Sequence, residues 1–348
     1  MVRQRGTRDG TRVVSGTVAS GVSATHKASA LQLLRESTWR NSQEEAESPT
    51  GERNLPRSKE LATTKPSPQD CIRLLGLRNS ADISAEHLAS LMVYMIGRVR
   101  EFAMDAVGCH LVQQVLLLAN ASMQKTVVCE MEGHVQQALE SPHANHVLQL
   151  AINLLAPSAV RFILDELMQC VHPVALARHP FGCRVLQRLI EHFPPEWLEQ
   201  PLREILQEVS PLCQHAYGNF VVQHMLEHCV PAVRKRIVAA ITQDIGNAAT
   251  HFSACGVLDK ALSYSTPEDQ QQLAAQVLSC RGLLVSMACQ RNGLAATHRL
   301  LLVAKGSLQD EAHAQLAAGR EKLHRSKHGR AFISGGMPQV AGQHSPEK

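Results

Sequence analysis

The stretch HPFGCRVLQRLIEH occupies residues 179–192, and a close copy of it, HAYGNFVVQHMLEH, occupies residues 215–228. Both place a glycine before a run in which aliphatic residues recur every three or four positions, which is typical of a helix with one buried face. The aliphatic positions and one glutamine stay constant, yet Gly-Cys-Arg in the first copy becomes Gly-Asn-Phe in the second. This contrast indicates that structural positions and positions with another role alternate in one helix.

The same pattern recurs along much of the chain. Related segments begin at residues 105 and 141, and less similar ones begin at 251 and 289. Taking the fifth position of the expected helix as a marker gives steps of 36, 38, 36, 36 and 38 residues between Gln113, Gln149, Gln187, Gln223, Asp259 and Thr297. A fixed period of this size indicates one supersecondary unit that stacks on copies of itself.

Other helical patterns lie between the markers, such as AVRFILDELMQCV at 159–171, and no segment predicts a strand. The sequence therefore predicts an all-α solenoid. The most apolar stretch, LASLMVYMIGRV at 88–99, is shorter than the ~18 residues of a membrane span and is predicted to be a buried helix.

Composition limits the function classes. The formal net charge is only +4, so nucleic-acid binding has to be argued from placed residues rather than from a general basic field. The ten cysteines form no Cys-x-x-Cys pairs, and several lie inside helical patterns. We interpret them as free thiols of a reducing compartment.

The ends of the chain differ from its middle. Residues 1–66 are rich in Gly, Ser, Thr and Arg without a sustained period, and are predicted to be a disordered basic tail. An organelle transit peptide is the alternative, because residues 1–35 hold six basic residues and only Asp9 as an acid. We expect the repeat domain to span 67–338 and residues 339–348 to be disordered.

The two faces of the repeated helix explain the alternation. Val185, Leu186 and Leu189 fall on one face and must pack into the stack, whereas Cys183 and Gln187 lie one turn apart on another face. Four glutamines in register, each preceded by Cys or Asn one turn earlier, are not expected of a generic solvated surface. A catalytic residue would not alternate between Cys and Asn, but a residue that selects a ligand could.

The sequence gives less support to a catalytic or metal-binding site than to ligand selection. HMLEH at 224–228 spells an inverted zinc-peptidase motif, but the preceding unit has RLIEH at the same place and no third ligand is identifiable. Cys183 beside His179 or His192 could suggest a nucleophile and its base, but no oxyanion hole is apparent. The sequence therefore predicts no enzyme, no cofactor and no metal.

At GCRVLQ (182–187), ANHVLQ (144–149) and GNFVVQ (218–223) the chain resembles the Pumilio (PUF) family of single-stranded RNA-binding repeat proteins. The resemblance covers roughly residues 85–335, and SKHGRAFIS at 326–334 is similar to the family's C-terminal capping segment. It implies a curved right-handed solenoid of about six three-helix repeats, with degenerate repeats at its ends.

The resemblance also implies roles for individual residues. The first and fifth positions of the helix would touch the Watson–Crick edge of a base, and the second would stack between bases. The pairs that resemble uracil readers are Asn145 with Gln149 and Asn219 with Gln223. Those that resemble adenine readers are Cys183 with Gln187 and Cys109 with Gln113. The planar stacking residues are His110, His146, Arg184 and Phe220.

In a uracil-type pair the Asn amide would bond O4 and N3–H, and Gln would reach O2. In an adenine-type pair the small thiol leaves room for the larger purine.

Two repeats depart from this pattern. Cys255, Gly256 and Asp259 stand where the family reads guanine, but Asp is shorter than Glu and Gly256 cannot stack. Gly293, Leu294 and Thr297 supply neither a planar group nor an amide, so that repeat is expected to pack without reading a base.

Because repeats of this family run antiparallel to RNA, the resemblance implies a core of 5′-(G)UAUA-3′. The expected function is sequence-selective binding of mRNA 3′ untranslated regions, with regulation of mRNA stability or translation. Expected partners of this monomeric cytoplasmic protein are single-stranded RNA and protein effectors, but no membrane. The alternative is a degenerate nuclear or nucleolar scaffold that binds pre-rRNA or protein in ribosome biogenesis.

Overall fold

The computed structural model describes residues 66–74, 76 and 83–335. The predicted N-terminal tail, except for Pro66, and the predicted disordered C-terminus lie outside these residues, so the predicted domain limits stay predictions. The described residues are helical and contain no strand. None of their helices is long and apolar enough to cross a membrane.

After α2 (Pro68–Leu74) and α3 (Ala85–Met95), the chain repeats one three-helix unit. Each unit has a short helix of six residues, a marked helix of 11 residues that carries the repeated motif, and an outer helix of 9 to 13 residues. The units are α4 (Val99–Met104), α5 (Gly108–Leu118) and α6 (Ala121–Cys129); α7 (Val135–Glu140), α8 (Ala144–Leu154) and α9 (Arg161–Cys170), with the 3₁₀ turn η3 (Pro157–Ala159) before α9; α10 (Pro173–Arg178), α11 (Gly182–His192) and α12 (Pro195–Gln207); α13 (Val209–Gln214), α14 (Gly218–His228) and α15 (Pro231–Gln243); α16 (Ile245–Thr250), α17 (Ala254–Tyr264) and α18 (Pro267–Ser279); and α19 (Leu283–Ala288), α20 (Gly293–Val303) and α21 (Ser307–Ala318).

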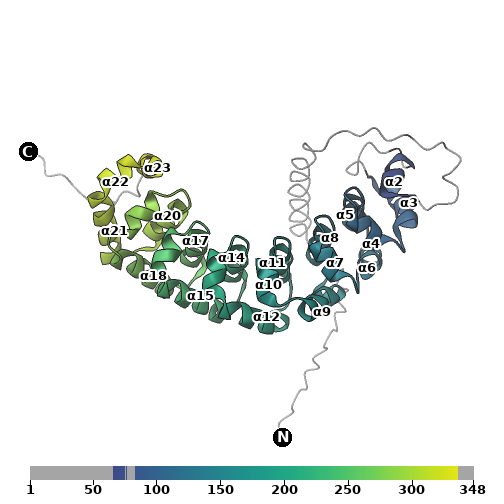
Figure 1. Ribbon diagram of the computed structural model, residues 1–348, viewed down its shortest axis with the longest axis horizontal. Helices are drawn as coiled ribbons and strands as arrows, with labels where there is room; N and C mark the ends of the chain where they lie inside the picture. Colours follow the sequence, from purple (N-terminus) through teal and green to yellow (C-terminus); the bar gives the residue numbers. More distant parts are fainter. Residues whose placement is uncertain (1–65, 75, 77–82, 336–348) are drawn as a thin grey trace, which may run out of the picture.

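The C-terminal pair α22 (Arg320–Arg325) and α23 (Lys327–Ser334) completes the stack. The predicted all-α solenoid of about six three-helix units is therefore confirmed. Figure 1 shows the units arranged in an arc, with the marked helices along its concave side and the outer helices along its convex side. Each marked helix packs against the marked helix of the next unit.

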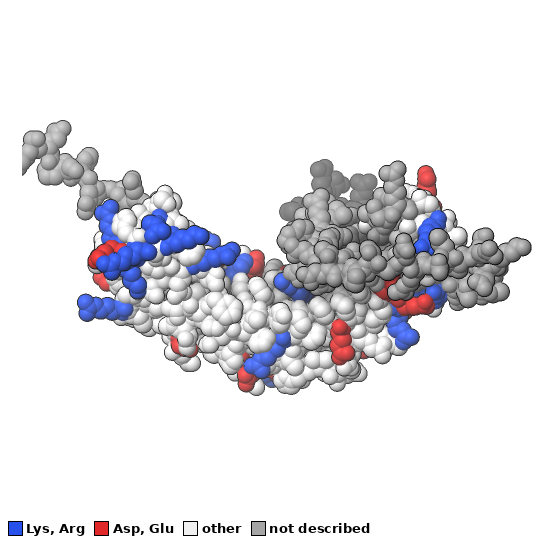
Figure 2. Space-filling view, turned by 45° about the horizontal axis from the view of Figure 1, so that its top comes forward, with Lys and Arg blue, Asp and Glu red and all other residues white. Residues whose placement is uncertain are grey.

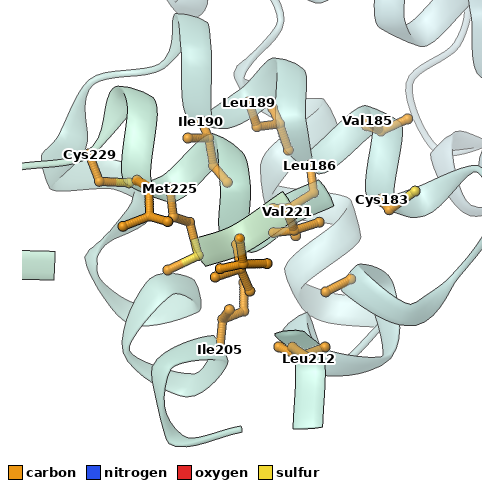
Figure 3. Close-up of a cluster of buried hydrophobic side chains, with 14 of the residues drawn as sticks. Cys183, Val185, Leu186, Leu189, Ile190, Ile205, Leu212, Val221, Met225 and Cys229 are labelled. Carbon is orange, nitrogen blue, oxygen red and sulfur yellow. The ribbon is translucent and has the colours of Figure 1, made fainter. Parts of the chain in front are cut away.

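The core lies inside each unit and between neighbours. Val185, Leu186 and Leu189 of α11 are buried among side chains from the adjoining helices, including Leu212 of α13 and Val221 of α14 (Figure 3). The aliphatic face predicted from the sequence is thus the face that joins the repeats.

The structure corrects the sequence prediction at the N-terminal end. The stretch 88–99 is not one buried helix, because α3 ends at Met95 and Gly97 takes a left-handed conformation with φ 81° before α4 begins. The backbone N–H groups of Gly97 and Val99 donate to the carboxylate of Glu130 at 2.7 and 3.0 Å. Within α3, Val93 is 78% exposed.

The register of the sixth unit also differs from the sequence prediction. The marked helices begin at residues 108, 144, 182, 218, 254 and 293, so the last step is 39 residues (293 minus 254) rather than 38. His298, not Thr297, therefore occupies the fifth-position place in α20. Thr297 is buried, and its hydroxyl donates to the carbonyl of Gly293 at 2.8 Å.

The glycine that begins most marked helices is required by a close approach. A Cβ atom on Gly108 would lie 2.3 Å from the carbonyl oxygen of Phe102 in the preceding short helix, and one on Gly293 would lie 2.4 Å from that of Met287. Ala144 and Ala254 occupy the same place in two units, so the spacing between short and marked helix varies along the array.

A side chain three residues before this glycine accepts its backbone N–H. Asp105 accepts from Gly108 at 2.7 Å, His179 from Gly182 at 2.9 Å and His215 from Gly218 at 3.2 Å. A histidine can accept at Nδ1 only when that nitrogen is unprotonated. Burial, with a smaller contribution from the charge of Arg178, lowers the pKa of His215 below its ordinary value.

We predict that Gly108→Ala destabilises the array by about 1–3 kcal/mol, because the new methyl group must displace backbone. The matched control is Gly246→Ala in α16, where an added Cβ would have no neighbour within 4 Å. That control should be neutral or stabilising by up to about 1 kcal/mol, since alanine has the higher helix propensity. Urea unfolding followed by circular dichroism measures both changes, and equal losses would contradict the close-approach argument.

The His215 cap predicts a pH dependence. Since the folded-state pKa is depressed, the unfolded chain binds the proton first as the pH falls below about 6.5, and the contribution of the cap to stability is lost. His215→Asp should remove this part of the pH dependence, because Asp caps as Asp105 does without needing a neutral ring. Thermal unfolding of both proteins at pH 7.5 and 5.5 tests this, and the same loss of stability in both would contradict it.

Candidate nucleic-acid interface

The predicted site residues lie in register on the marked helices, along the concave side of the arc (Figure 1). Each first-position residue is the second residue of its helix, directly after the closely packed Gly or Ala. This placement fixes where the first and fifth positions lie in every unit. The structure thus brings the predicted residues of five consecutive units into one continuous row.

Most first- and fifth-position side chains are buried in this RNA-free structure. The buried members of the row are Cys109, Gln113, Asn145, Gln149, Cys183, Gln187, Asn219 and Cys255. The next unit also approaches the half-buried Gln223, because a Cβ atom on Gly256 would lie 3.0 Å from its Nε2. The row is therefore a set of closely packed polar groups and not an open solvated face.

In the two Asn–Gln units the pair is joined by its own hydrogen bond. Nε2 of Gln149 donates to Oδ1 of Asn145 at 2.9 Å, and Nε2 of Gln223 donates to Oδ1 of Asn219 at 2.9 Å. Nδ2 of Asn219 donates to the backbone carbonyls of His215 and Ala216 at 2.8 and 3.0 Å. Asn219 is thus anchored to the turn that precedes its helix, and in both units the asparagine fixes the orientation of the glutamine amide.

The two Cys–Gln units lack that constraint. Sγ of Cys183 donates to the carbonyl of Pro180 at 3.3 Å, and Sγ of Cys109 donates to that of Ala106 at 3.3 Å. Gln113 turns its Nε2 to the carbonyl of Cys109 at 3.1 Å, whereas Nε2 of Gln187 is fully buried and has no partner among the described residues. The same residue pair therefore holds its glutamine in two different ways.

Burial disfavours ionisation of two of the buried thiols in the row. Burial raises the pKa of Cys109 to about 12 and that of Cys255 to about 11. At neutral pH both stay protonated, whereas a catalytic cysteine acts as the thiolate. His179, which the sequence could suggest as a base for Cys183, instead accepts N–H groups at the start of α11.

The second-position residues line the row beside these pairs. His110, His146 and Arg184 are half-buried, and Phe220 is 38% exposed. The guanidinium carbon of Arg184 lies 5.1 Å from the centre of the Phe220 ring, and its Nη1 donates to Oε1 of Gln187 at 3.3 Å. The planar groups of neighbouring units thus contact each other directly.

The fifth and sixth units differ from the others. Cys255 donates its thiol hydrogen to the carbonyl of Ala249 at 3.1 Å, and Asp259 lies 3.6 Å from Nε of Arg299 in α20. Sequence reasoning missed Arg299 and the marker place of His298. Aligning Gly293 with the glycines that begin the other marked helices would have revealed this register.

Charge is unevenly distributed over the surface. Lys and Arg side chains gather near the C-terminal end, whereas the middle of the described surface in Figure 2 is mostly uncharged. The exposed Lys and Arg residues of the last two helices are Arg320, Lys322, Arg325, Lys327 and Arg330. One end of the arc is therefore locally basic, a feature that the formal net charge of +4 does not reveal.

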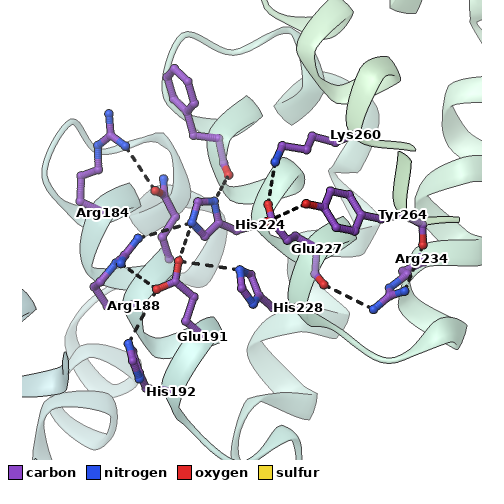
Figure 4. A network of polar contacts seen from close by, with 12 residues as sticks. Arg184, Arg188, Glu191, His192, His224, Glu227, His228, Arg234, Lys260 and Tyr264 are labelled. Carbon is purple, nitrogen blue, oxygen red and sulfur yellow. Dashed lines mark hydrogen bonds and ion pairs between the residues drawn. The ribbon is translucent and has the colours of Figure 1, made fainter. Parts of the chain in front are cut away.

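Polar contacts join the marked helices beyond the glutamines (Figure 4). Glu227 bonds to Lys260 and Tyr264 at 2.7 and 2.9 Å, so the glutamate of HMLEH does not share a site with its two histidines. Glu191 of α11 instead lies 2.7 Å from His224. Burial raises the pKa of Glu191, but the hydrogen bond from His224 and the charge of Arg188 outweigh it and hold that pKa below its ordinary value.

The described fold and row of side chains define a class: an α-helical repeat protein whose marked helices carry one equivalent set of side chains per unit. A family model described as the Pumilio-family RNA-binding repeat matches residues 98–131, 141–168, 174–196, 208–242 and 249–278. The chain belongs to the Pumilio family of RNA-binding repeat proteins. The matched repeats accordingly belong to a family of RNA-binding proteins rather than enzymes.

Among curated proteins, the chain is 27% identical over 108 residues to a Pumilio domain-containing protein of Schizosaccharomyces pombe. The match covers 31% of this chain but only 16% of that relative.

Solved structures agree in fold. PUF-8 in complex with PBE-RNA is 23% identical, covering 72% of this chain and 73% of that one with a TM-score of 0.64. The Puf3 RNA-binding domain bound to a Cox17 RNA 3′ UTR recognition sequence is 20% identical, covering 76% and 83% with a TM-score of 0.67.

Proposed function

We propose that the concave row binds single-stranded RNA with sequence preference, reading a core related to 5′-(G)UAUA-3′ in antiparallel orientation. The observation that carries this proposal is the register of the Asn–Gln and Cys–Gln pairs, with one pair in each of four consecutive units. The structures of PUF-8 in complex with PBE-RNA and of the Puf3 domain bound to a 3′ UTR recognition sequence support single-stranded RNA as the ligand class.

The hydrogen bonds suggest how Asn and Cys would select different bases. With Asn219 accepting from Nε2 of Gln223, the second N–H and Oε1 of Gln223 remain to pair with a carbonyl and the N3–H of uracil. In this arrangement the asparagine orients the glutamine amide, and the glutamine contacts the base. The sequence interpretation instead gave the asparagine the contacts with O4 and N3–H of uracil.

The buried Nε2 of Gln187 fits a different role. Its unpartnered N–H groups could donate to N1 of adenine while Oε1 accepts from the exocyclic amine. A buried donor without a partner costs about 1–3 kcal/mol, so a base that supplies an acceptor would remove that penalty. The thiol of Cys183 does not fix the amide, which leaves Gln187 able to take this orientation.

Base stacking requires a local opening. A base between Arg184 and Phe220 needs roughly 7 Å, twice the 3.4 Å stacking distance, but the guanidinium lies 5.1 Å from the ring centre. RNA would replace this cation–π contact with stacking on both faces of the base, worth about 1–3 kcal/mol per base. Arg184 would at the same time release Oε1 of Gln187 for the base.

The basic C-terminal end would supply phosphate contacts. In the antiparallel orientation the 5′ side of the RNA reaches the last units, where Lys327 and Arg330 are exposed. The candidate guanine reader, Asp259, forms an ion pair with Arg299 and would have to leave it to accept from guanine.

We further propose that the protein acts on messenger RNA 3′ untranslated regions in the cytoplasm, as a monomer that affects mRNA stability or translation through protein effectors. The degenerate fifth and sixth units favour the second candidate, a nuclear or nucleolar scaffold that binds pre-rRNA or protein with little sequence preference. An organelle remains the third location, through the basic N-terminal segment. RNA crosslinking in cells separates messenger from pre-ribosomal targets.

The base assignment is tested by substituting the first- and second-position residues of two neighbouring units. Cys183→Asn with Arg184→Tyr should change the preference at one base from A to U, by roughly tenfold or more in relative affinity. The reciprocal variant, Asn219→Cys with Phe220→Arg, should change the neighbouring preference from U to A. Fluorescence anisotropy with a set of single-base RNA variants measures both.

Each variant serves as the control for the other, because the substitutions leave the aliphatic positions untouched. Loss of affinity for all RNAs alike, without a change in preference at the assigned base, would contradict the proposed register.

A further inference from the structure

One contact between marked helices recurs with different chemistry. The residue four positions beyond the marker faces the residues one and five positions beyond the marker of the next unit. Between α14 and α17 these residues are Glu227, Lys260 and Tyr264, with distances of 2.7 and 2.9 Å from the carboxylate (Figure 4). Both partners of Glu227 bring their own hydrogen to the carboxylate, so this contact is complete.

Between α11 and α14 the equivalent residues are Glu191, His224 and His228. Oε1 of Glu191 lies 2.7 Å from Nε2 of His224 and 3.9 Å from Nε2 of His228. The three candidate ligand atoms lie within 4.8 Å of one another. Two imidazoles spaced by four residues share one face of α14, and the carboxylate reaches them from the neighbouring helix.

The orientation of His224 is informative. Its Nδ1 lies 3.2 Å from the carbonyl oxygen of Phe220, which can only accept, so Nδ1 carries the hydrogen. In the protonated ring Nε2–H donates to the carboxylate oxygen 2.7 Å away, whereas in the neutral ring Nε2 is a lone pair at the same distance. Two acceptors at this distance need either a proton or a metal ion between them. A backbone carbonyl on the far nitrogen is also the usual support of a metal-bound histidine.

The other carboxylate oxygen is held in place. Nη1 of Arg188 lies 2.7 Å from Oε2 of Glu191, which leaves Oε1 directed at the two imidazoles. Hydrogen bonds of this kind orient ligating carboxylates. Arg188 is also the main competitor of a cation, because its Nη2 lies 3.4 Å from Nε2 of His224. His192 adds a further nitrogen 3.8 Å from Oε2.

We propose that Glu191, His224 and His228 bind a Zn²⁺ ion between α11 and α14, with water completing the coordination. Two imidazole nitrogens and one carboxylate oxygen match a donor set that proteins use for zinc. Bond lengths near 2.0–2.1 Å place tetrahedral ligand atoms about 3.3 Å apart, between the two distances from Glu191 Oε1. The exposed fractions of the side chains, 15% for Glu191, 23% for His224 and 36% for His228, leave the site reachable from solvent.

Such an ion would link the two central units. Glu191 lies one turn beyond Gln187, and His224 follows Gln223 directly in sequence. The ion would therefore tie together the helices that carry the Cys183–Gln187 and Asn219–Gln223 pairs. The proposal stands independently of which RNA those pairs read.

The chain itself offers the control. His224→Lys with His228→Tyr copies the complete contact of Lys260 and Tyr264 into the α11–α14 position. This variant should keep the fold and the link between the helices, because the new lysine and tyrosine give Glu191 an ammonium and a hydroxyl partner. It loses both imidazole ligands.

The test uses the full chain, reduced and freed of metal by a chelator, in parallel with the variant. Co²⁺ titration followed by visible absorption and Zn²⁺ titration by calorimetry should find one more bound ion per chain in the wild type than in the variant. The wild-type Tm should rise with the logarithm of free Zn²⁺ more steeply than that of the variant.

Because the ten free cysteines can bind metal in both proteins, the difference between them decides the result. Equal stoichiometry and an equal Zn²⁺ response of Tm, or no binding by either protein, would overturn the proposal and leave the cluster as an ion pair. Binding that disappears in the variant while its circular dichroism spectrum is kept would establish the site.

Discussion

The structure depends on the burial of one aliphatic face in each marked helix. Val185 and Leu189 of α11 are fully buried among the short, outer and neighbouring marked helices, so these positions cannot change without loss of packing. Burying one large aliphatic side chain stabilises the fold by about 1.5–3 kcal/mol. Because this stabilisation recurs in every unit, it fixes the rotation of each marked helix about its axis. That rotation places the first, second and fifth positions toward the concave side of every unit.

A fixed rotation allows residues on the concave side to vary independently of the fold. Asn219 and Cys183 occupy equivalent places, yet the first bonds to its glutamine and the second does not. The same freedom extends to the contact one turn further on, where Lys260 and Tyr264 in one interface correspond to His224 and His228 in the previous one. The array thus keeps its geometry constant while the chemistry between neighbouring units changes.

Much of this could be predicted from the sequence, because hydrophobic period and repeat length report directly on helix packing. The helix-rich repeat and the register of five units followed from the spacing of the glutamines. The register of the sixth unit did not, because the sequence interpretation took Thr297 as the marker, whereas aligning Gly293 with the glycines that begin the other marked helices gives His298. The prediction of a single helix at 88–99 was wrong because the left-handed turn at Gly97 interrupts the helix.

Burial and contacts between units lay beyond sequence reasoning. Periodicity put Cys183 and Gln187 on a polar face, but it could not show that both side chains are buried. The triad of Glu191 with His224 and His228 joins residues 33 and 37 positions apart (224 minus 191 and 228 minus 191), which a motif within one helix cannot reveal. The motif HMLEH places Glu227 between the two histidines in sequence, but its carboxylate contacts α17 instead.

The central claim is that the row of side-chain pairs on the concave side carries base preference. Selection from a random pool of single-stranded RNA by a fragment spanning residues 80–340, followed by sequencing, tests it most directly. The account predicts enrichment of U-A-U cores, extended to UAUA where Cys109 and Gln113 also read. Binding without any enriched U-A-U core would contradict it and would favour a scaffold that binds RNA without reading its bases.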